Sequence, residues 1–278
     1  MRLFSIVTAV LVGFSSNSLL TRGALGGGYL DPASFTMIRL VTGALTLMLL
    51  VRLRGQPSDG RTSWASALWL AGYAIPFTVA YVRIGAAVGA LLLFGAVQVT
   101  MIGTGLLRGE RPARIDWLGV ALAVAGLVVL TLPGLDAPDP VGAALMIAAG
   151  VCWGGYSLAG QRGVDPLGRT ARAFARGSVL ALPFLLLSLG SVQLTQTGVW
   201  LAAASGSLAS GVAYTLWYTA LPSLAAWRAA IIQLIVPVLT ALAAAVLLSE
   251  AVTPRLLAAT GLVASGVWLT VWPAKHRT

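Results

Sequence analysis

The sequence predicts an all-α, polytopic membrane protein with ten transmembrane helices, arranged as two inverted five-helix repeats. Three observations support this fold class. Of the 278 residues, 58% are hydrophobic and 9% are charged, and the mean hydropathy is +0.90, more apolar than a soluble domain can bury. Ten windows are long and apolar enough to cross a bilayer. The two halves of the chain also resemble each other at an offset of 140 residues.

The predicted spans follow one another with short connections. A hydrocarbon core of about 30 Å needs about 20 helical residues, and windows of this kind lie at 3–21, 32–51, 64–82, 85–107, 115–132, 140–160, 173–190, 198–220, 225–248 and 254–272. Turn residues mark the ends of the first, second and fifth, at 26–28, 55–60 and 133–140. The first window resembles a signal peptide, but no small-x-small cleavage site ends it, so we expect it to remain as the first helix.

The repeat consists of identical residues at equivalent positions. The pairs are Arg22 and Arg162, Gly23 and Gly163, Thr100 and Thr240, Leu107 and Leu247, Glu110 and Glu250, Gly126 and Gly266, and Pro133 and Pro273. Because each half carries five spans, the second half enters the membrane from the opposite side. We therefore expect one repeat over 1–134 and an inverted repeat over 139–278, an arrangement by which many carriers build one central site.

The basic residues predict the orientation. With the N-terminus inside, fourteen Lys and Arg residues fall on the inner side and three, Arg22, Arg83 and Arg255, on the outer side. Both termini are thus expected in the cytoplasm, and the net charge of +10 reflects topology and not a nucleic-acid surface. The Arg, Ala and Gly bias suggests a bacterial genome, which predicts a bacterial inner-membrane protein.

Aromatic side chains share helix faces within the predicted spans. These faces hold Tyr73, Phe77 and Tyr81 in span three, Trp153 and Tyr156 in span six, and Tyr214, Trp217 and Tyr218 in span eight. Any one of them is as readily explained by core packing. As a set they favour a binding site, because hydroxyl and indole N–H groups need polar partners at this depth.

Polar side chains within the spans leave two interpretations open. The amides of Asn17, Gln98 and Gln233 either bond a neighbouring helix or offer a donor and an acceptor to a zwitterion in a cavity. Arg39 is the one basic residue well inside a span, which makes it a functional candidate by default. The alternative, which the sequence favours, is a structural one: Arg39 lies only eight residues from Asp31, near the start of the span, and either snorkels or pairs structurally.

Several kinds of chemistry are absent from the spans. Every acidic residue lies in a loop or at a span end, so no carboxylate is placed for proton coupling. Glu110 and Glu250, which are equivalent in the repeat, are each expected to cap the following turn or to fix the loop, a structural role. The one histidine, His276, and the one lysine, Lys275, lie in the C-terminal tail, which argues against a Ser-His protease, a histidine metal site and a P-loop. We expect no enzyme activity, metal or cofactor, but a carrier or pore that moves a solute down its own gradient.

Several motifs resemble, in order and across nearly the whole chain, the EamA-type carriers of the drug/metabolite transporter superfamily. They are residues 13–18 with their repeat partners 152–157, Arg39, residues 214–221, Pro237, and the Leu-Leu-x-x-Glu and Leu-Leu-Ser-Glu ends at 106–110 and 247–250. The chain departs from the pattern at Val97, which stands opposite Pro237 in the repeat, where the family often has a second proline. Within the superfamily the chain is most similar to the YddG-type exporters of aromatic and other neutral amino acids.

The resemblance implies a basket of ten helices around a central cavity, with amino acids or related amphipathic metabolites as substrates in a lipid bilayer, and a transporter that acts as a monomer. The site residues it implies are Asn17, Tyr73, Phe77, Tyr81, Phe94, Gln98, Trp153, Tyr156, Tyr214, Trp217, Tyr218 and Gln233. A broader drug, metabolite or nucleotide-sugar carrier of the same fold is the alternative, although a sugar nucleotide needs more basic residues in the cavity than Arg39. A membrane scaffold or embedded enzyme is a third hypothesis, against which the inverted repeat and the missing catalytic residues argue.

Overall fold

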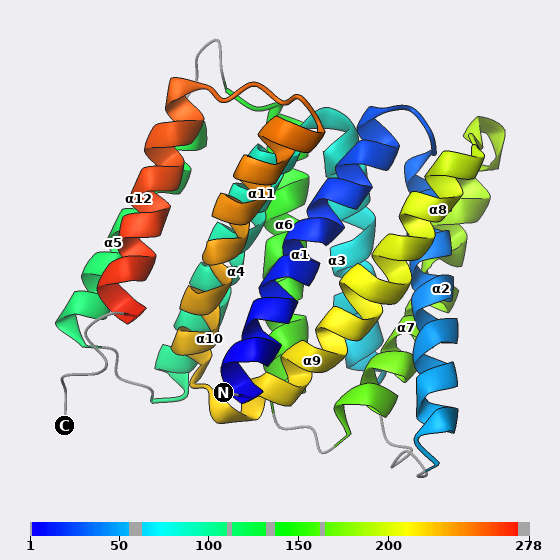
Figure 1. The fold of residues 1–278 in the computed structure, drawn as a ribbon, viewed down its shortest axis with the longest axis horizontal. Coiled ribbons are helices and arrows are strands. Elements are labelled where there is room, and N and C mark those ends of the chain that lie inside the picture. The colour runs from blue at the N-terminus through cyan, green and yellow to red at the C-terminus, as the bar shows by residue number, and fades with distance from the viewer. Residues whose placement is uncertain (1, 56–62, 110–112, 132–136, 162–164, 272–278) are drawn as a thin grey trace.

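The computed structural model describes residues 2–55, 63–109, 113–131, 137–161 and 165–271, and within these ranges it confirms the all-α fold class (Figure 1). The α-helices are α1 (Arg2–Gly26), α2 (Pro32–Leu53), α3 (Trp64–Arg83), α4 (Ala86–Leu107), α5 (Arg114–Thr131), α6 (Pro140–Gly160), α7 (Pro166–Leu187), α8 (Gln196–Ala204), α9 (Ala213–Ala220), α10 (Ala226–Gln233), α11 (Ile235–Leu247) and α12 (Pro254–Val271). A π-helical segment, η2 (Ser205–Val212), joins α8 to α9, and two short 3₁₀ turns are η1 (Leu189–Ser191) and η3 (Leu221–Ser223). Among the described residues, eight helical segments are long and apolar enough to cross a membrane. Helices α5 and α12 occupy the two remaining predicted windows.

Three helices begin at an Asp-Pro pair, in which the aspartate caps the helix and the proline takes its first position. Asp31, Asp139 and Asp165 each accept a hydrogen bond from the backbone N–H three residues later, at 2.7–3.1 Å. Aspartate favours the N-cap, and proline tolerates the first turn because its missing N–H would be unpaired there. The cap at Asp165 corrects one prediction, because α7 begins at Pro166 and not at residue 173.

The ninth span is broken, as a proline within it predicts. Helix α10 ends at Gln233 and α11 begins at Ile235, so the break lies at Leu234, three residues before Pro237. A proline ring clashes with the carbonyl four residues earlier and removes one N–H donor. The equivalent helix in the first half has Val97 in place of the proline, and α4 runs without a break.

Helices α3, α4 and α6 pack against one another behind α1, which lies beside α8, η2 and α9 on one side and α11 on the other (Figure 1). Helices α5 and α12 form a pair at one edge of the molecule, and α2 packs on α7 toward the other edge. Residues from α1, α3, α4, α6 and α9 therefore meet at the centre.

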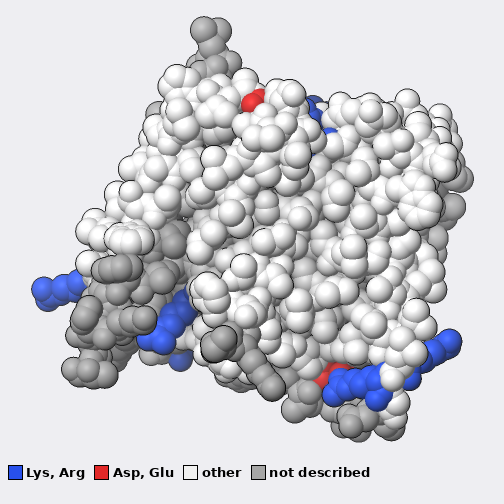
Figure 2. All heavy atoms as spheres, viewed as in Figure 1, with Lys and Arg blue, Asp and Glu red and all other residues white. Residues whose placement is uncertain are grey.

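Burial in this fold is arranged as a membrane requires. The largest fully buried side chains include Trp217, Arg39, Tyr81, Tyr156 and Tyr214, all of which carry a polar group. Large aliphatic side chains are exposed, and the face in Figure 2 carries its charged side chains near the two ends, with none across the middle. Polar groups inside and apolar groups outside are what a helical bundle in lipid needs.

Candidate functional site

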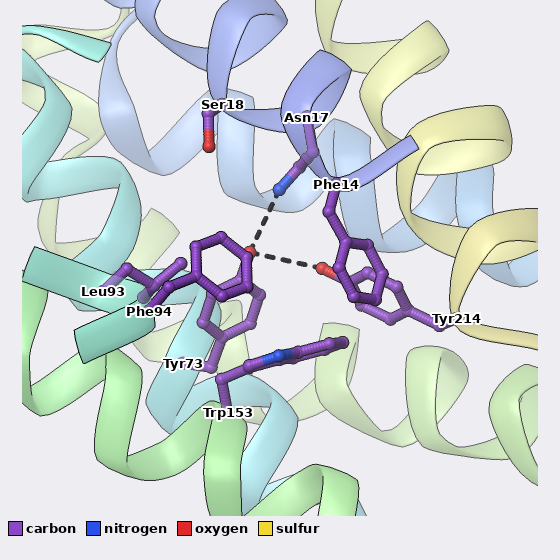
Figure 3. A pocket seen from close by; sticks show the side chains of 8 residues that line it. All are labelled: Phe14, Asn17, Ser18, Tyr73, Leu93, Phe94, Trp153 and Tyr214. Carbon is purple, nitrogen blue, oxygen red and sulfur yellow. Dashed lines mark hydrogen bonds between the residues drawn. The ribbon is translucent and has the colours of Figure 1, made fainter. Parts of the chain in front are cut away.

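A small cavity lies at the centre of the bundle, between α1, α3, α4, α6 and α9 (Figure 3). Its lining residues are Phe14, Asn17, Ser18, Tyr73, Leu93, Phe94, Trp153 and Tyr214. The volume open to the centre of a water-sized sphere is about 10 Å³, which is room for about one water molecule. The site is thus closed in this structure, and its side chains fill the space.

Aromatic rings form most of the cavity wall. The ring centroid of Trp153 lies 4.4 Å from that of Tyr214 and 5.2 Å from those of Tyr73 and Phe14, the last in an edge-to-face arrangement. Phe14 also stacks on Phe94 at 6.3 Å. These distances are in the favourable range for aromatic pairs. The rings come from five helices, so a change in helix spacing would change the shape of the cavity.

Polar atoms converge among these rings (Figure 3). The Asn17 amide nitrogen donates to the Tyr73 hydroxyl at 3.0 Å, and the Tyr214 hydroxyl donates to the same oxygen at 3.2 Å (Figure 3). The Asn17 carbonyl oxygen accepts from the hydroxyls of Ser205 at 2.7 Å and Ser210 at 3.2 Å. The network joins α1 and α3 to the eighth span, which lies far away in the sequence.

Arg39 of α2 supplies the charge in this network. It is 1% exposed. Its Nη2 donates to the hydroxyls of Tyr214 at 2.7 Å and Tyr73 at 3.1 Å, and its Nε donates to Ser210 Oγ at 3.0 Å. The rings of Tyr73 and Phe77 lie 5.1 Å from the guanidinium carbon, within cation–π range. Arg39 therefore does not snorkel to the interface, and Asp31 caps α2 and does not pair with it. Its hydrogen bonds lie within the bundle and are compatible with a structural and with a functional role.

The π-helical segment η2 brings the eighth span close to α2. A Cβ atom added to Gly206 would lie 2.8 Å from the carbonyl carbon of Arg39 and closer still to its oxygen. Across the same contact, a Cβ on Gly43 would lie 2.8 Å from the carbonyl oxygen of Gly206. Only glycine allows this approach, which holds Ser210 in reach of Arg39. Single π turns within helices are frequent at functional sites.

A second set of buried polar contacts surrounds the cavity on the side of α6. Trp153 Nε1 donates to the Gln233 carbonyl oxygen at 2.8 Å, and Trp217 Nε1 donates to Ser157 Oγ at 3.3 Å. The Tyr218 hydroxyl donates to the Tyr156 backbone carbonyl at 2.7 Å. These bonds satisfy the donors of Trp153, Trp217 and Tyr218, whereas the buried hydroxyls of Tyr81 and Tyr156 have no hydrogen-bond partner among the described residues.

One end of the bundle is closed by an ion pair. Glu250 accepts from the Arg22 Nε at 3.3 Å and from the Ala86 N–H at 2.8 Å, and Arg22 also donates to the Tyr81 carbonyl at 2.8 Å. The Glu250 carboxylate thus caps the N-terminus of α4, where negative charge is favoured. Of the two roles predicted for Glu250, the cap of the following turn is wrong, because the carboxylate accepts from the Ala86 N–H, 164 residues away in the sequence. Its bonds to Arg22 and Ala86 instead fix the loop between α11 and α12. Glu110 lies outside the described residues.

The comparisons with known proteins decide the family. The model described as "EamA-like transporter family" matches residues 140–272. An uncharacterized protein of Pseudomonas aeruginosa is 46% identical over 277 residues, which is 99% of this chain and 96% of that protein. An uncharacterized transporter of Archaeoglobus fulgidus is 30% identical over 87% of this chain and 88% of its own length.

The chain belongs to the EamA-like transporter family. This EamA-like transporter is also similar to the threonine/homoserine exporter RhtA of Escherichia coli K12, at 29% identity over 87% of this chain and 82% of RhtA. A solved crystal structure shares the fold, with a TM-score of 0.79 and 20% identity over 99% of both chains. The protein is therefore a multi-pass membrane transporter of the drug/metabolite transporter superfamily.

The predicted site residues of the EamA-like transporter fall into two groups. Those that line the cavity are Asn17, Tyr73, Phe94, Trp153 and Tyr214. Those that lie buried around it without lining it are Phe77, Tyr81, Gln98, Tyr156, Trp217, Tyr218 and Gln233. The first group therefore contacts the cavity directly, and the second does not.

Sequence reasoning missed three lining residues of the EamA-like transporter, Phe14, Ser18 and Leu93. Phe14 and Ser18 lie three residues before and one after Asn17, so the helical spacing of span one could have indicated Phe14. Leu93 carries no distinguishing feature in an apolar span. Among the described residues, no group of three or more His, Cys, Asp or Glu could hold a metal ion.

Proposed function

We propose that this EamA-like transporter exports neutral amino acids through the central cavity, by alternating access and down the gradient of the solute. The observation that carries the proposal is the division of the cavity into an aromatic wall and a polar cluster. A neutral amino acid has an apolar or weakly polar side chain and a zwitterionic end, so it matches both. The name of RhtA, a threonine/homoserine exporter, supports the same solute class.

Alternating access requires two halves that move against each other, and the helix bounds support two repeats, over 1–134 and 139–278. Shifted by 140 residues, α4 (Ala86–Leu107) coincides with Ala226–Leu247, the bounds of α10 and α11 together. The same shift places α5 (Arg114–Thr131) on α12 (Pro254–Val271).

The contacts between helices follow the same 140-residue relation. Helix α6 packs on α3 and α4, and its repeat equivalent α1 packs on α9 and α11. The self-related pairs α2 with α7, and α5 with α12, lie side by side. An exchange of these equivalent contacts would close one end of the cavity as it opens the other.

The distribution of arginines favours cytoplasmic termini. At the end where α1 begins, Arg54 pairs with Asp165 at 3.2 Å and Arg108 donates to Gln161 at 3.4 Å. Other arginines at this end of the described helices are Arg52, Arg114, Arg169, Arg172, Arg176 and Arg228, whereas Arg22, Arg83 and Arg255 lie at the opposite end. Basic residues accumulate on the cytoplasmic side of membrane proteins. The end closed by Arg22 and Glu250 is then the outer end.

The solute gradient is the driving force that this site supports. In the described helices, Asp31, Asp139 and Asp165 are N-caps and Glu250 lies at a helix end. None of them lines the central cavity. Proton-coupled carriers use an ionisable group at depth, so we expect transport to be independent of a proton gradient.

The test is efflux from proteoliposomes loaded with labelled threonine, homoserine, phenylalanine or tryptophan, with and without an imposed proton gradient. Efflux of any of these that ignores the gradient supports the proposal. Efflux that requires the gradient keeps the solute and refutes the facilitative mechanism. If sugar nucleotides or cationic drugs compete and amino acids do not, the broader carrier of the same fold replaces the proposal.

A further inference from the structure

The central polar cluster has more hydrogen-bond donors than acceptors. The Tyr73 oxygen, which has two lone pairs, receives donors from Asn17, Arg39 and Tyr214. The Asn17 carbonyl oxygen accepts from Ser205 and Ser210, which uses both of its lone pairs. Arg39 Nη1, a further donor in the cluster, has no acceptor among the described residues. The cluster therefore lacks an acceptor.

The same cluster carries an uncompensated positive charge. Arg39 is 1% exposed, its Nη1 has no hydrogen-bond partner, and none of the ion pairs among the described residues includes it. Its hydrogen-bond partners, Tyr73, Tyr214 and Ser210, are neutral. A buried cation without a counter-ion is costly in a protein and more so in a bilayer. The cluster therefore also lacks an anion.

We propose that Arg39 and its partners bind the carboxylate of the transported solute. A carboxylate supplies the missing negative charge and about four acceptor sites, and its hydrogen bonds to arginine are among the strongest that proteins form. Asn17, Tyr73 and Tyr214 line the cavity, and Arg39 is bonded directly to both phenols. The solute's two oxygens lie against this carboxylate cluster (Asn17, Arg39, Tyr73 and Tyr214), where Arg39 is the counter-ion.

This inference rests on the proposed function and narrows the substrate class. Phe14, Phe94 and Trp153 also line the cavity, with Phe14 and Trp153 packed against the ring of Tyr214, and their rings offer an apolar surface to the solute's side chain (Figure 3). One arginine matches one carboxylate. Neutral amino acids and monocarboxylic acids of similar size fit this charge balance, whereas amines and amino-acid amides do not.

The experiment compares acids with their amides. Efflux of labelled phenylalanine and threonine is competed with phenylalanine, threonine, their amides and 3-phenyllactate, which keeps the carboxylate but lacks the amine. We expect both amides to compete on the order of tenfold or more weaker than the parent acids, because hydrogen bonds to charged groups contribute more than neutral ones. 3-Phenyllactate retains most of the competition of phenylalanine.

Variants distinguish binding of the carboxylate from a structural role. Arg39→Gln and Tyr73→Phe are expected to bring the ratio of acid to amide competition toward one, and Arg39→Lys to give an intermediate ratio because lysine keeps the charge without the planar fork. Arg54→Gln removes an arginine that is half-exposed at the end of the bundle, and it should keep the wild-type ratio. If Arg39→Gln does not fold, Tyr73→Phe still tests the cluster.

The outcomes separate this inference from the proposed function. If amino acids are transported and amides compete as well as the parent acids, carboxylate recognition is refuted, but the proposed exporter function is not. Reduced efflux in the Arg39 and Tyr73 variants with an unchanged ratio makes Arg39 structural. If no amino acid is transported, thermal stabilisation of the purified wild type by 3-phenyllactate, lost in Tyr73→Phe, supports the carboxylate site alone. No stabilisation by this acid overturns it.

Discussion

The contact between Gly206 and α2 provides a prediction whose size follows from the structure. A Cβ in Gly206→Ala would lie 2.8 Å from the Arg39 carbonyl carbon. Carbon atoms are in optimal contact at about 3.5–4.0 Å. The obstacle is backbone and cannot rotate away, so α2 and η2 must separate by roughly 1 Å. Overpacking of this kind costs about 1–3 kcal/mol.

The separation also breaks the bond that η2 makes with the charged side chain. Arg39 Nε lies 3.0 Å from Ser210 Oγ. A further shift of roughly 1 Å takes this pair beyond hydrogen-bond distance. A buried charged group left without a partner adds a cost of about 1–3 kcal/mol or more. We expect Gly206→Ala to lower the free energy of unfolding by about 2–5 kcal/mol and to abolish most transport.

The measurement is thermal unfolding of purified protein in detergent, followed by efflux from proteoliposomes at equal protein content. Gly103→Ala is the matched control, because a Cβ on Gly103 meets no atom within 4 Å. Alanine there should be neutral or stabilising, given its higher helix propensity. Equal unfolding temperatures and equal transport for the two variants would refute the argument that backbone contact forms the site.

Three other perturbations have expected outcomes. Glu250→Gln removes the charge that holds Arg22 and the N-terminus of α4, so the outer end should open more readily, and a cysteine probe placed there should be labelled faster than in wild type; an unchanged rate contradicts the role of this ion pair. Trp153→Phe keeps a ring but loses an indole N–H bond of 2.8 Å, so efflux should fall several-fold while Trp200→Phe, at an exposed position, changes little; similar efflux from both argues against Trp153. Burial raises the pKa of the Asp31 carboxyl, but hydrogen bonds from the Ser34 side chain and from the backbone N–H groups of Ser34, Gln193 and Ala33 outweigh burial and leave the pKa below its ordinary value. Asp31 should therefore stabilise the fold fully above about pH 4 and progressively less as the pH falls through its lowered pKa; unfolding curves of wild type and Asp31→Asn should converge in acid, and a constant difference would be inconsistent with this sign.

The sequence was sufficient to locate the spans because the bilayer imposes a length and a composition on each helix. The predicted windows at 140–160 and 254–272 lie within one residue of α6 and α12. The start of α7 was misplaced by seven residues, since Arg169, Arg172 and Arg176 lower the local hydropathy although they lie inside the helix. A capping pair, Asp165 and Pro166, was the better indicator of the start.

The aromatic and amide residues of the site could be selected from depth and helical spacing alone, because polar groups within spans are scarce. Depth and helical spacing could not show which of these residues line the cavity and which lie behind it. Tyr73 and Phe77 lie one turn apart on the same face, yet only Tyr73 lines the cavity. Which of two neighbours reaches the centre depends on the rotation and tilt of α3 against α1 and α6, and a single helix does not fix either.

Sequence by itself determined that this chain crosses a membrane, where most of the helices lie and which polar residues stand at depth. These properties follow from local composition and spacing, on which the bilayer acts directly. Tertiary structure alone decided what those polar residues touch. Arg39 stands near Asp31 in the sequence but bonds to Tyr73, Tyr214 and Ser210, because the glycine contact between α2 and η2 brings a distant span within hydrogen-bond reach. Hydrogen bonds act over about 3 Å, and only packing sets distances on that scale.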